Sequence, residues 1–90
     1  MINKDDFTIM GLYPMPLQNL GNIHYIVHQN TTMKISIYDL SGKKIRELQN
    51  ERMVPGIYNL SFDSTTISSG NYVVAIETDN TRISRNIVVK

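Results

Sequence analysis

Two histidines are the residues of this 90-residue chain whose spacing could serve a metal ion. His24 and His28 stand four positions apart, and on a helix that spacing turns both imidazoles toward one ion. On a strand the pair shares a face but lies about 13 Å apart, at roughly 3.3 Å per residue, which is too far for one ion. The residues around them alternate as in a strand, so we expect two solvent-facing histidines and no metal site.

No other grouping of residues is typical of catalysis. Serine, histidine and aspartate occur without a nucleophile elbow or another catalytic spacing, and there is no Gly-rich phosphate loop. The adjacent Asp5 and Asp6 lie near the amino terminus, where a preorganised site is not expected. The chain has no cysteine, which excludes disulfides, thiolate catalysis and zinc–sulfur sites. The sequence therefore predicts a protein that is not an enzyme and has no cofactor.

Composition indicates one small globular domain that neither binds nucleic acid nor inserts into a membrane. Hydrophobic residues make up 41% of the chain and charged residues 19%, which differs from a disordered profile. The net charge is only +1, with both signs mixed, whereas a nucleic-acid footprint needs a one-sided basic excess. No stretch approaches the roughly 20 apolar residues of a membrane span. The first residues also lack the apolar centre of a secretory signal, so we expect either a cytoplasmic protein or an excerpt whose leader lies upstream.

The elements that carry these residues are predicted to be strands, because apolar side chains recur at every second position. Four segments show this alternation clearly, and each is expected to bury one face. The predicted buried positions are Ile23, Tyr25 and Val27; Met33, Ile35 and Ile37; Tyr58, Leu60 and Phe62; and Tyr72, Val74 and Ile76. The positions between them, such as His24, Lys34 and Glu77, are expected to face outward.

Turn residues such as Gly, Pro, Asn and Asp divide the chain at regular intervals. Further strands are expected near Phe7–Leu12, at Lys44–Gln49 and at the final apolar run. An amphipathic helix over Lys43–Met53 is the alternative for the second of these, but that segment lacks an N-cap. Seven short strands separated by turns predict an all-β fold, an immunoglobulin-like antiparallel β-sandwich.

Two segments share the pattern Gly-x-Tyr at the start of a strand, Gly56-Ile57-Tyr58 and Gly70-Asn71-Tyr72. The pattern indicates that both strands begin in the same way. In a seven-strand immunoglobulin-like order the second motif opens the sixth strand, where a tyrosine corner is found. We therefore expect a structural role for Tyr72.

Five motifs, in this order and spacing, resemble the C-terminal sorting domain of proteins exported by the type IX (Por) secretion system of Bacteroidetes. They are LYPMPLQNLGNIHYIV, ISIYDLSGKKIREL, PGIYNLSFD, ISSGNYVVAIET and the final IVVK. The resemblance covers roughly residues 12 to 90. We accordingly divide the chain into an N-terminal linker with a possible first strand, residues 1–11, and the sorting domain, residues 12–90.

The opening motif supplies the first residues that we expect to be recognised, Tyr13, Pro14 and Pro16. It resembles the family's Tyr-Pro-Asn-Pro, with Met15 in place of asparagine and Leu17 where phenylalanine is common. Two prolines fix φ and forbid a helix, which gives a rigid extended approach to the next strand.

The later motifs supply the other expected recognition residues. Gly42 lies in the strand–turn–strand centre, where Asp39 and Ser41 are expected to bond the turn. Gly70 and Tyr72 belong to the Ser-Gly-x-Tyr element. The last four are Ile87, Val88, Val89 and Lys90.

The resemblance implies a non-enzymatic export signal. Such a domain follows an N-terminal cargo and directs it through the periplasm to the outer-membrane translocon. There a sortase-like protease typically removes it, and the cargo is released or attached to the cell surface. The resemblance thus implies a secreted or cell-surface location, with a cleavage site upstream of Met1 or within residues 1–11.

We expect the final strand to lie at a sheet edge, where its unpaired backbone groups are available to another chain. Arg85 falls in phase with Ile83, Ile87 and Val89, which predicts a bulge or a rim position near it. One hypothesis is that the translocon reads this edge; the other is that the strand only closes the sandwich.

Two further functions remain open. A fibronectin type III-like or immunoglobulin-like accessory or spacer module of an extracellular enzyme or assembly protein is the main alternative. If such a module bound carbohydrate it would expose aromatic side chains on one face, and Tyr38 is the one clear candidate. A cytoplasmic regulator is the third reading.

Overall fold

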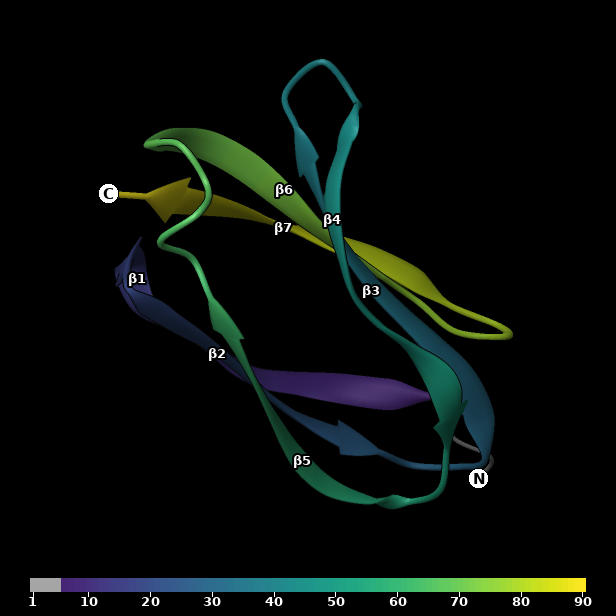
Figure 1. Ribbon diagram of the computed structural model, residues 1–90. Coiled ribbons are helices and arrows are strands. Elements are labelled where there is room, and N and C mark those ends of the chain that lie inside the picture. Colours follow the sequence, from purple (N-terminus) through teal and green to yellow (C-terminus); the bar gives the residue numbers. More distant parts are fainter. Residues whose placement is uncertain (1–5) are drawn as a thin grey trace.

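The computed structural model describes residues 6–90, which form seven strands and no helix (Figure 1). The strands are β1 (Phe7–Gln18), β2 (Leu20–Val27), β3 (Thr31–Asp39), β4 (Lys44–Met53), β5 (Gly56–Asp63), β6 (Gly70–Glu77) and β7 (Arg82–Val89). The predicted all-β class is confirmed. Within these residues no helix of the length and hydrophobicity that a membrane crossing requires is present.

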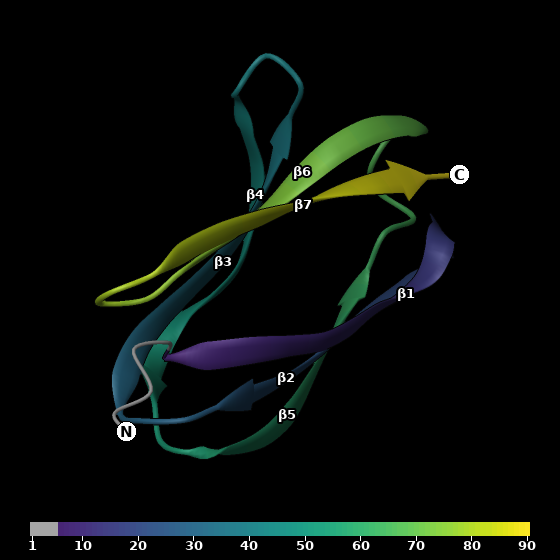
Figure 2. The same cartoon turned by 180° about the vertical axis from the view of Figure 1, so that it is seen from behind.

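Two antiparallel sheets pack face to face as a sandwich. Sheet A consists of β1, β2 and β5, and sheet B of β4, β3, β6 and β7, each in that order. A single parallel bridge, from Leu17 of β1 to Val89 of β7, connects the two sheets. Figures 1 and 2 show that β1 and β7 approach each other at this bridge, near the C label.

The core lies between the sheets and consists of the alternating side chains that the sequence predicted. Ile35 pairs with Ile76 and Ile37 with Val74, and directly opposed residues of an antiparallel pair share a face. All four are fully buried. Burying such a side chain contributes about 1.5–3 kcal/mol relative to leaving it exposed, so this strip is a main source of stability.

Polar links join the sheets on the side of β4 and β5. The Arg46 guanidinium donates to the backbone oxygen of Asp63 at 2.5 Å and to the Thr66 hydroxyl. Gln49 donates through Nε2 to the Tyr25 hydroxyl at 3.1 Å. These links close one flank of the sandwich, because each runs from β4 to sheet A or to the residues that follow β5.

The segment Lys44–Met53, for which the sequence allowed either a strand or a helix, is the strand β4. The helical alternative is wrong. β4 pairs with β3 over its whole length, with two register shifts next to Leu48 and Ile45. A bulge lets two residues of one strand oppose one of its partner, which blurs the alternation along the bulged strand. This irregularity is the reason that the sequence pattern of β4 could also suit a helix.

Two expectations for the final strand are corrected, the first in part. Among residues 6–90, β7 pairs only with β6 over most of its length, as expected of an edge strand, but the Leu17–Val89 bridge occupies its other side at the carboxyl end. The β6–β7 ladder has no register shift, so there is no bulge at Arg85. The shift lies instead in β1, between Ile9 and Gly11. Arg85 does occupy a rim position, because its side chain is exposed between the two sheets.

The opening motif marks the place where β1 changes sheets. Tyr13 pairs with Asn22 in sheet A, and the following residues leave that ladder until Gln18 pairs with Leu20. Leu17 reaches β7 within this interruption. The Tyr13–Pro14 peptide bond is cis. Prolines suit this position because they donate no backbone hydrogen bond to a ladder.

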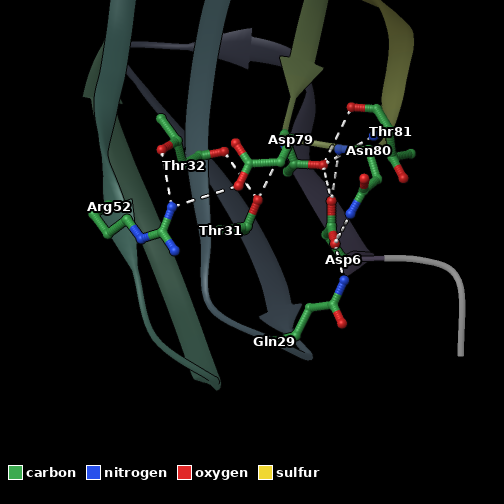
Figure 3. A network of polar contacts seen from close by, with 9 residues as sticks. Asp6, Gln29, Thr31, Thr32, Arg52, Asp79, Asn80 and Thr81 are labelled. Carbon is green, nitrogen blue, oxygen red and sulfur yellow. Dashed lines mark hydrogen bonds and ion pairs between the residues drawn. The ribbon is translucent and has the colours of Figure 1, made fainter. Parts of the chain in front are cut away.

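Asp6 holds together the end of the sandwich that lies opposite the Leu17–Val89 bridge (Figure 3). Its carboxylate is 1% exposed and accepts hydrogen bonds from Gln29, Thr78 and Asn80, the last through the backbone N–H at 3.1 Å and through Nδ2 at 3.2 Å. Its backbone oxygen accepts the N–H of His28 at 2.8 Å. Asp6 thereby joins the start of β1 to the β2–β3 and β6–β7 connections.

These contacts keep the Asp6 carboxylate charged, and within residues 6–90 no cation forms an ion pair with it. Burial raises the pKa of Asp6, but the hydrogen bonds from Thr78, Gln29 and Asn80 outweigh burial, so the pKa lies below its ordinary value of 3.8. A group whose pKa is lowered by folding stabilises the fold at pH above its unfolded value. That contribution is lost as the pH falls through the folded-state pKa.

We expect the substitution Asp6→Asn to lower the free energy of unfolding at pH 7 by about 1–3 kcal/mol, because buried donors lose their charged acceptor. The difference from the wild type should shrink as the pH falls below about 4, where the carboxyl is protonated in the unfolded chain, and should vanish below the folded-state pKa. Urea denaturation followed by circular dichroism at several pH values measures both effects. Asp79→Asn is the control, because Asp79 is exposed and the change should be nearly neutral. Equal stability of Asp6→Asn and wild type at pH 7 would contradict this role.

Candidate functional site: one end of the sandwich

Most of the expected recognition residues gather at the end of the sandwich where β1 and β7 meet. Gly70 pairs with Val89 and Tyr72 with Ile87, while the bridge from Leu17 brings the end of β1 beside them. Tyr72 also pairs with Asp39, the residue before the β3–β4 turn that contains Gly42. We call this region the C-end: residues 13–17, 39–43, 68–72 and 87–90. Motifs far apart in the sequence are thus neighbours in space.

The last four residues alternate between core and surface. Ile87 and Val89 are 1% and 3% exposed and belong to the hydrophobic core. Val88 is 41% exposed and Lys90 is exposed as well. Lys90 lines a polar hollow together with Asn19 and residues of the β5–β6 connection. A partner at the C-end can therefore contact Val88 and Lys90 without disturbing the core.

The opening motif presents its proline rings to solvent. Tyr13 is 46% exposed, and Pro14 and Pro16 are exposed too. A rigid, exposed aromatic and proline surface loses little conformational entropy on binding. These residues therefore suit a contact surface better than a core.

Tyr72 forms the predicted tyrosine corner. Its hydroxyl donates to the backbone oxygen of Ser68 at 2.6 Å. Gly70 has a φ of 154°, in a region that residues with a side chain rarely adopt, so glycine permits the sharp start of β6. Tyr72 is half-buried against the core. Its function in the fold is structural.

Tyr58 makes the same contact at the start of β5, which was not predicted. Its hydroxyl donates to the backbone oxygen of Val54 at 2.7 Å, again four residues upstream. Its ring also stacks on Tyr25 with centroids 5.5 Å apart. The shared Gly-x-Tyr pattern was the sequence feature that could have assigned this contact.

The β3–β4 turn is bonded as expected. The Asp39 carboxylate accepts from the Ser41 N–H at 2.9 Å, from the Ser41 hydroxyl at 2.6 Å and from the Lys43 N–H at 2.9 Å. These hydrogen bonds, that of the Ser41 hydroxyl first, hold the pKa of Asp39 below its ordinary value. Gly42 has a φ of 92°, so a side chain there would be strained. The turn projects away from the meeting point of β1 and β7, at the top of Figure 1, so Gly42 lies apart from the other expected recognition residues.

The described residues hold no metal-binding cluster. Among residues 6–90, no group of three or more His, Cys, Asp or Glu side chains is placed to hold a metal ion. His24 lies on the outer face of β2, and His28 follows that strand and contacts the Thr8 hydroxyl at 2.7 Å through Nε2. What the C-end provides is a shaped, exposed surface on a rigid support.

Comparison with known families identifies the class. The family model of the secretion system C-terminal sorting domain matches residues 11–90, which is nearly the whole chain. The chain belongs to this family, and it is a C-terminal sorting domain of the type IX secretion system. No curated protein and no solved structure shows significant similarity to the chain.

We expect Tyr72→Phe and Tyr58→Phe each to lower the free energy of unfolding by about 0.5–1.5 kcal/mol, because each removes one hydrogen bond to a backbone oxygen. The effects should add, since the two tyrosines lie on strands of different sheets. Thermal and urea unfolding measure them. Tyr38→Phe is the matched control, because Tyr38 lies on the outer face of sheet B. A loss as large for Tyr38→Phe would show that the corner bond is not the cause.

Proposed function

We propose that this domain directs an attached N-terminal cargo protein through the type IX secretion system across the outer membrane. The domain itself performs no catalysis. Its partners are the outer-membrane translocon and a sortase-like protease, which removes the domain after the cargo has passed through the periplasm. The cargo is then released or attached to the cell surface.

The observation that carries the proposal is the family match over residues 11–90. The geometry of the C-end supports it, because the motif residues lie together although they are dispersed in the sequence. A receptor that binds the folded C-end would therefore contact several motifs at once. The same receptor would not bind an unfolded chain, in which those motifs are apart.

The surface we assign to the translocon is the exposed part of the C-end. It comprises Val88 and Lys90 from β7 and its end, together with Tyr13, Pro14 and Pro16 from β1. Ile87, Val89, Gly70, Tyr72 and Gly42 act through the fold, since they bury side chains or fix turns. This division separates contact residues from supporting residues within the set expected from the sequence.

The proposal predicts that Val88→Glu and Lys90→Glu abolish export of a reporter fused in front of the domain while the domain stays folded. Loss of about 1.4 kcal/mol of binding free energy raises the dissociation constant for the translocon about tenfold, and a buried or clashing carboxylate costs more than that. Export is measured as reporter activity in the culture medium of a bacterium with a type IX system. Deleting the last four residues is a poor test, because it would also remove Ile87 and Val89 from the core.

The matched control is Ile57→Glu. Ile57 is 73% exposed on β5, so this variant also places a carboxylate on an exposed apolar position, but away from the C-end. It should be exported normally. Normal export of both Val88→Glu and Lys90→Glu would refute the assigned surface, and failure of the unaltered domain to export a reporter would refute the proposed function itself.

The alternative function, an accessory or spacer module, gives a different mature protein. A sorting domain that is removed is absent from the secreted product, whereas an accessory module stays attached. We expect the mass of the mature secreted protein to lack the sorting domain, residues 12–90. Intact-mass spectrometry of the protein from culture medium decides between the two, and a mass that retains the domain would favour the accessory module.

A further inference from the structure

The flank of the sandwich between β1 and β7 is closed at both ends and open in the middle. At one end Asp6 bonds the β6–β7 connection, and at the other Leu17 pairs with Val89. Between these ties, among residues 6–90, β1 pairs only with β2, and β7 pairs only with β6. Both strands therefore present free backbone N–H and C=O groups along this flank (Figure 2).

Two adjoining hollows lie along the open part, and we call them together the β1–β7 groove. Ile9 and Arg85 line both. Phe7 and Ile83 add apolar surface to one hollow, and Leu12 adds it to the other. Ile9, Leu12 and Ile83 also pack against the hydrophobic core. The groove thus has an apolar floor beside two unpaired strand edges.

Arg85 stands in the groove in an unusual position. It pairs with Val74, which is fully buried, so the Arg85 side chain leaves the backbone on the inner face of sheet B. The side chain is nevertheless exposed, so it extends through the gap between the sheets. Its one hydrogen bond within residues 6–90 goes to the neighbouring Ser84 oxygen at 3.2 Å. No carboxylate of the described chain forms an ion pair with it.

The charges along this flank have one sign. β1 contains no charged residue, and β7 with the residue after it contains Arg82, Arg85 and Lys90 but no acidic residue. Arg82 is paired with Glu77 at 3.5 Å. An inward-pointing charge on an edge strand prevents like edges from pairing. A second copy of β7 would bring Arg85 against positive charge, so β7 of a second copy is not the occupant.

We propose that the β1–β7 groove binds an extended acidic segment of a partner protein, which pairs as an added strand with the free edge of β7. Backbone hydrogen bonds supply part of the affinity, and alternate side chains of the segment contact the apolar floor. A carboxylate of the segment forms a charge-assisted hydrogen bond with the Arg85 guanidinium. The same arginine rejects basic segments and β7 of other copies of the domain. This binding goes beyond the proposed function and does not depend on it, because it is a property of the folded chain.

The test is a nuclear magnetic resonance titration of the isotope-labelled full chain with a blocked peptide, Glu-Thr-Val-Thr-Glu-Thr-Val, whose valines and glutamates share one face when it is extended. We expect chemical-shift changes confined to Phe7–Leu12 and Arg82–Val88, and an affinity that falls as salt is added. Arg85→Glu should weaken binding about tenfold or more, the consequence of losing a charge-assisted hydrogen bond. Arg85→Gln, which keeps a polar side chain, should give an intermediate loss.

The matched control is Arg52→Glu, which makes the same charge change on β4, the edge strand on the opposite flank. It should leave the affinity unchanged, and the peptide with lysine in place of glutamate should not bind. Absence of binding at millimolar peptide, shifts on β4 or β5 instead, or equal weakening by Arg52→Glu would each overturn the proposal. Reporter export by Arg85→Glu is measured separately, so a failure of this proposal is distinguishable from a failure of the sorting function.

Discussion

The structure depends on β1, the strand that pairs with both sheets. Packed sheets lie about 10 Å apart, whereas paired strands lie about 4.8 Å apart, so no residue of β1 can pair with β2 and cross to β7 at once. β1 therefore has to interrupt its ladder with β2 before Leu17 can reach Val89. The prolines of the opening motif occupy this interruption, where missing backbone donors cost nothing. The bridge then fixes the end of β7 between β6 and β1.

The two ends of the sandwich are held by different physical means. At the C-end the ties are main-chain pairing and tyrosine hydroxyls bonded to backbone oxygens. At the other end a buried carboxylate collects neutral donors from two connections. The second kind of tie weakens in acid, because its acceptor is a carboxylate whose pKa is lowered by folding. The β1–β7 groove lies between the two ends of the sandwich, because the contacts at neither end extend along the flank between β1 and β7.

Much of the fold could be predicted from the alternation of apolar side chains, since burial on one face of a strand imposes a period of two. The inner positions of β2, β3 and β6, such as Ile23, Ile37 and Val74, follow directly from it. The bulges of β4 and the sheet change of β1 could not be predicted in this way, because they depend on partners far away in the sequence. Asp6 was dismissed for the same reason, because the donors of Thr78 and Asn80 come from the other end of the chain.

The candidate site could likewise be predicted only in part. Family motifs selected residues that the structure brings together, but they did not distinguish surface from support: Val88 is exposed while Ile87 is buried. Arg85 was noticed only as a break in the alternation. The surroundings of Arg85 depend on which strand lies opposite β7 across the flank. The sequence alone does not give that arrangement. The hydrogen bond of Tyr58 could have been predicted, because Tyr58 stands in the same Gly-x-Tyr pattern as Tyr72.

The elongated form of the molecule has a mechanical consequence. Its longest dimension is 42 Å against 23 and 21 Å, and β1 begins at the end opposite to the C label (Figure 1). If a receptor holds the C-end while a tethered cargo is drawn from the start of β1, the tension runs along the strands. Tension in that direction strains the rungs of the β1–β2 ladder together, whereas a pull across the strands would open them one after another. Resistance to such a load is governed by the unfolding rate rather than by the equilibrium free energy. A small domain of this shape can thus bear force between its two ends without a disulfide.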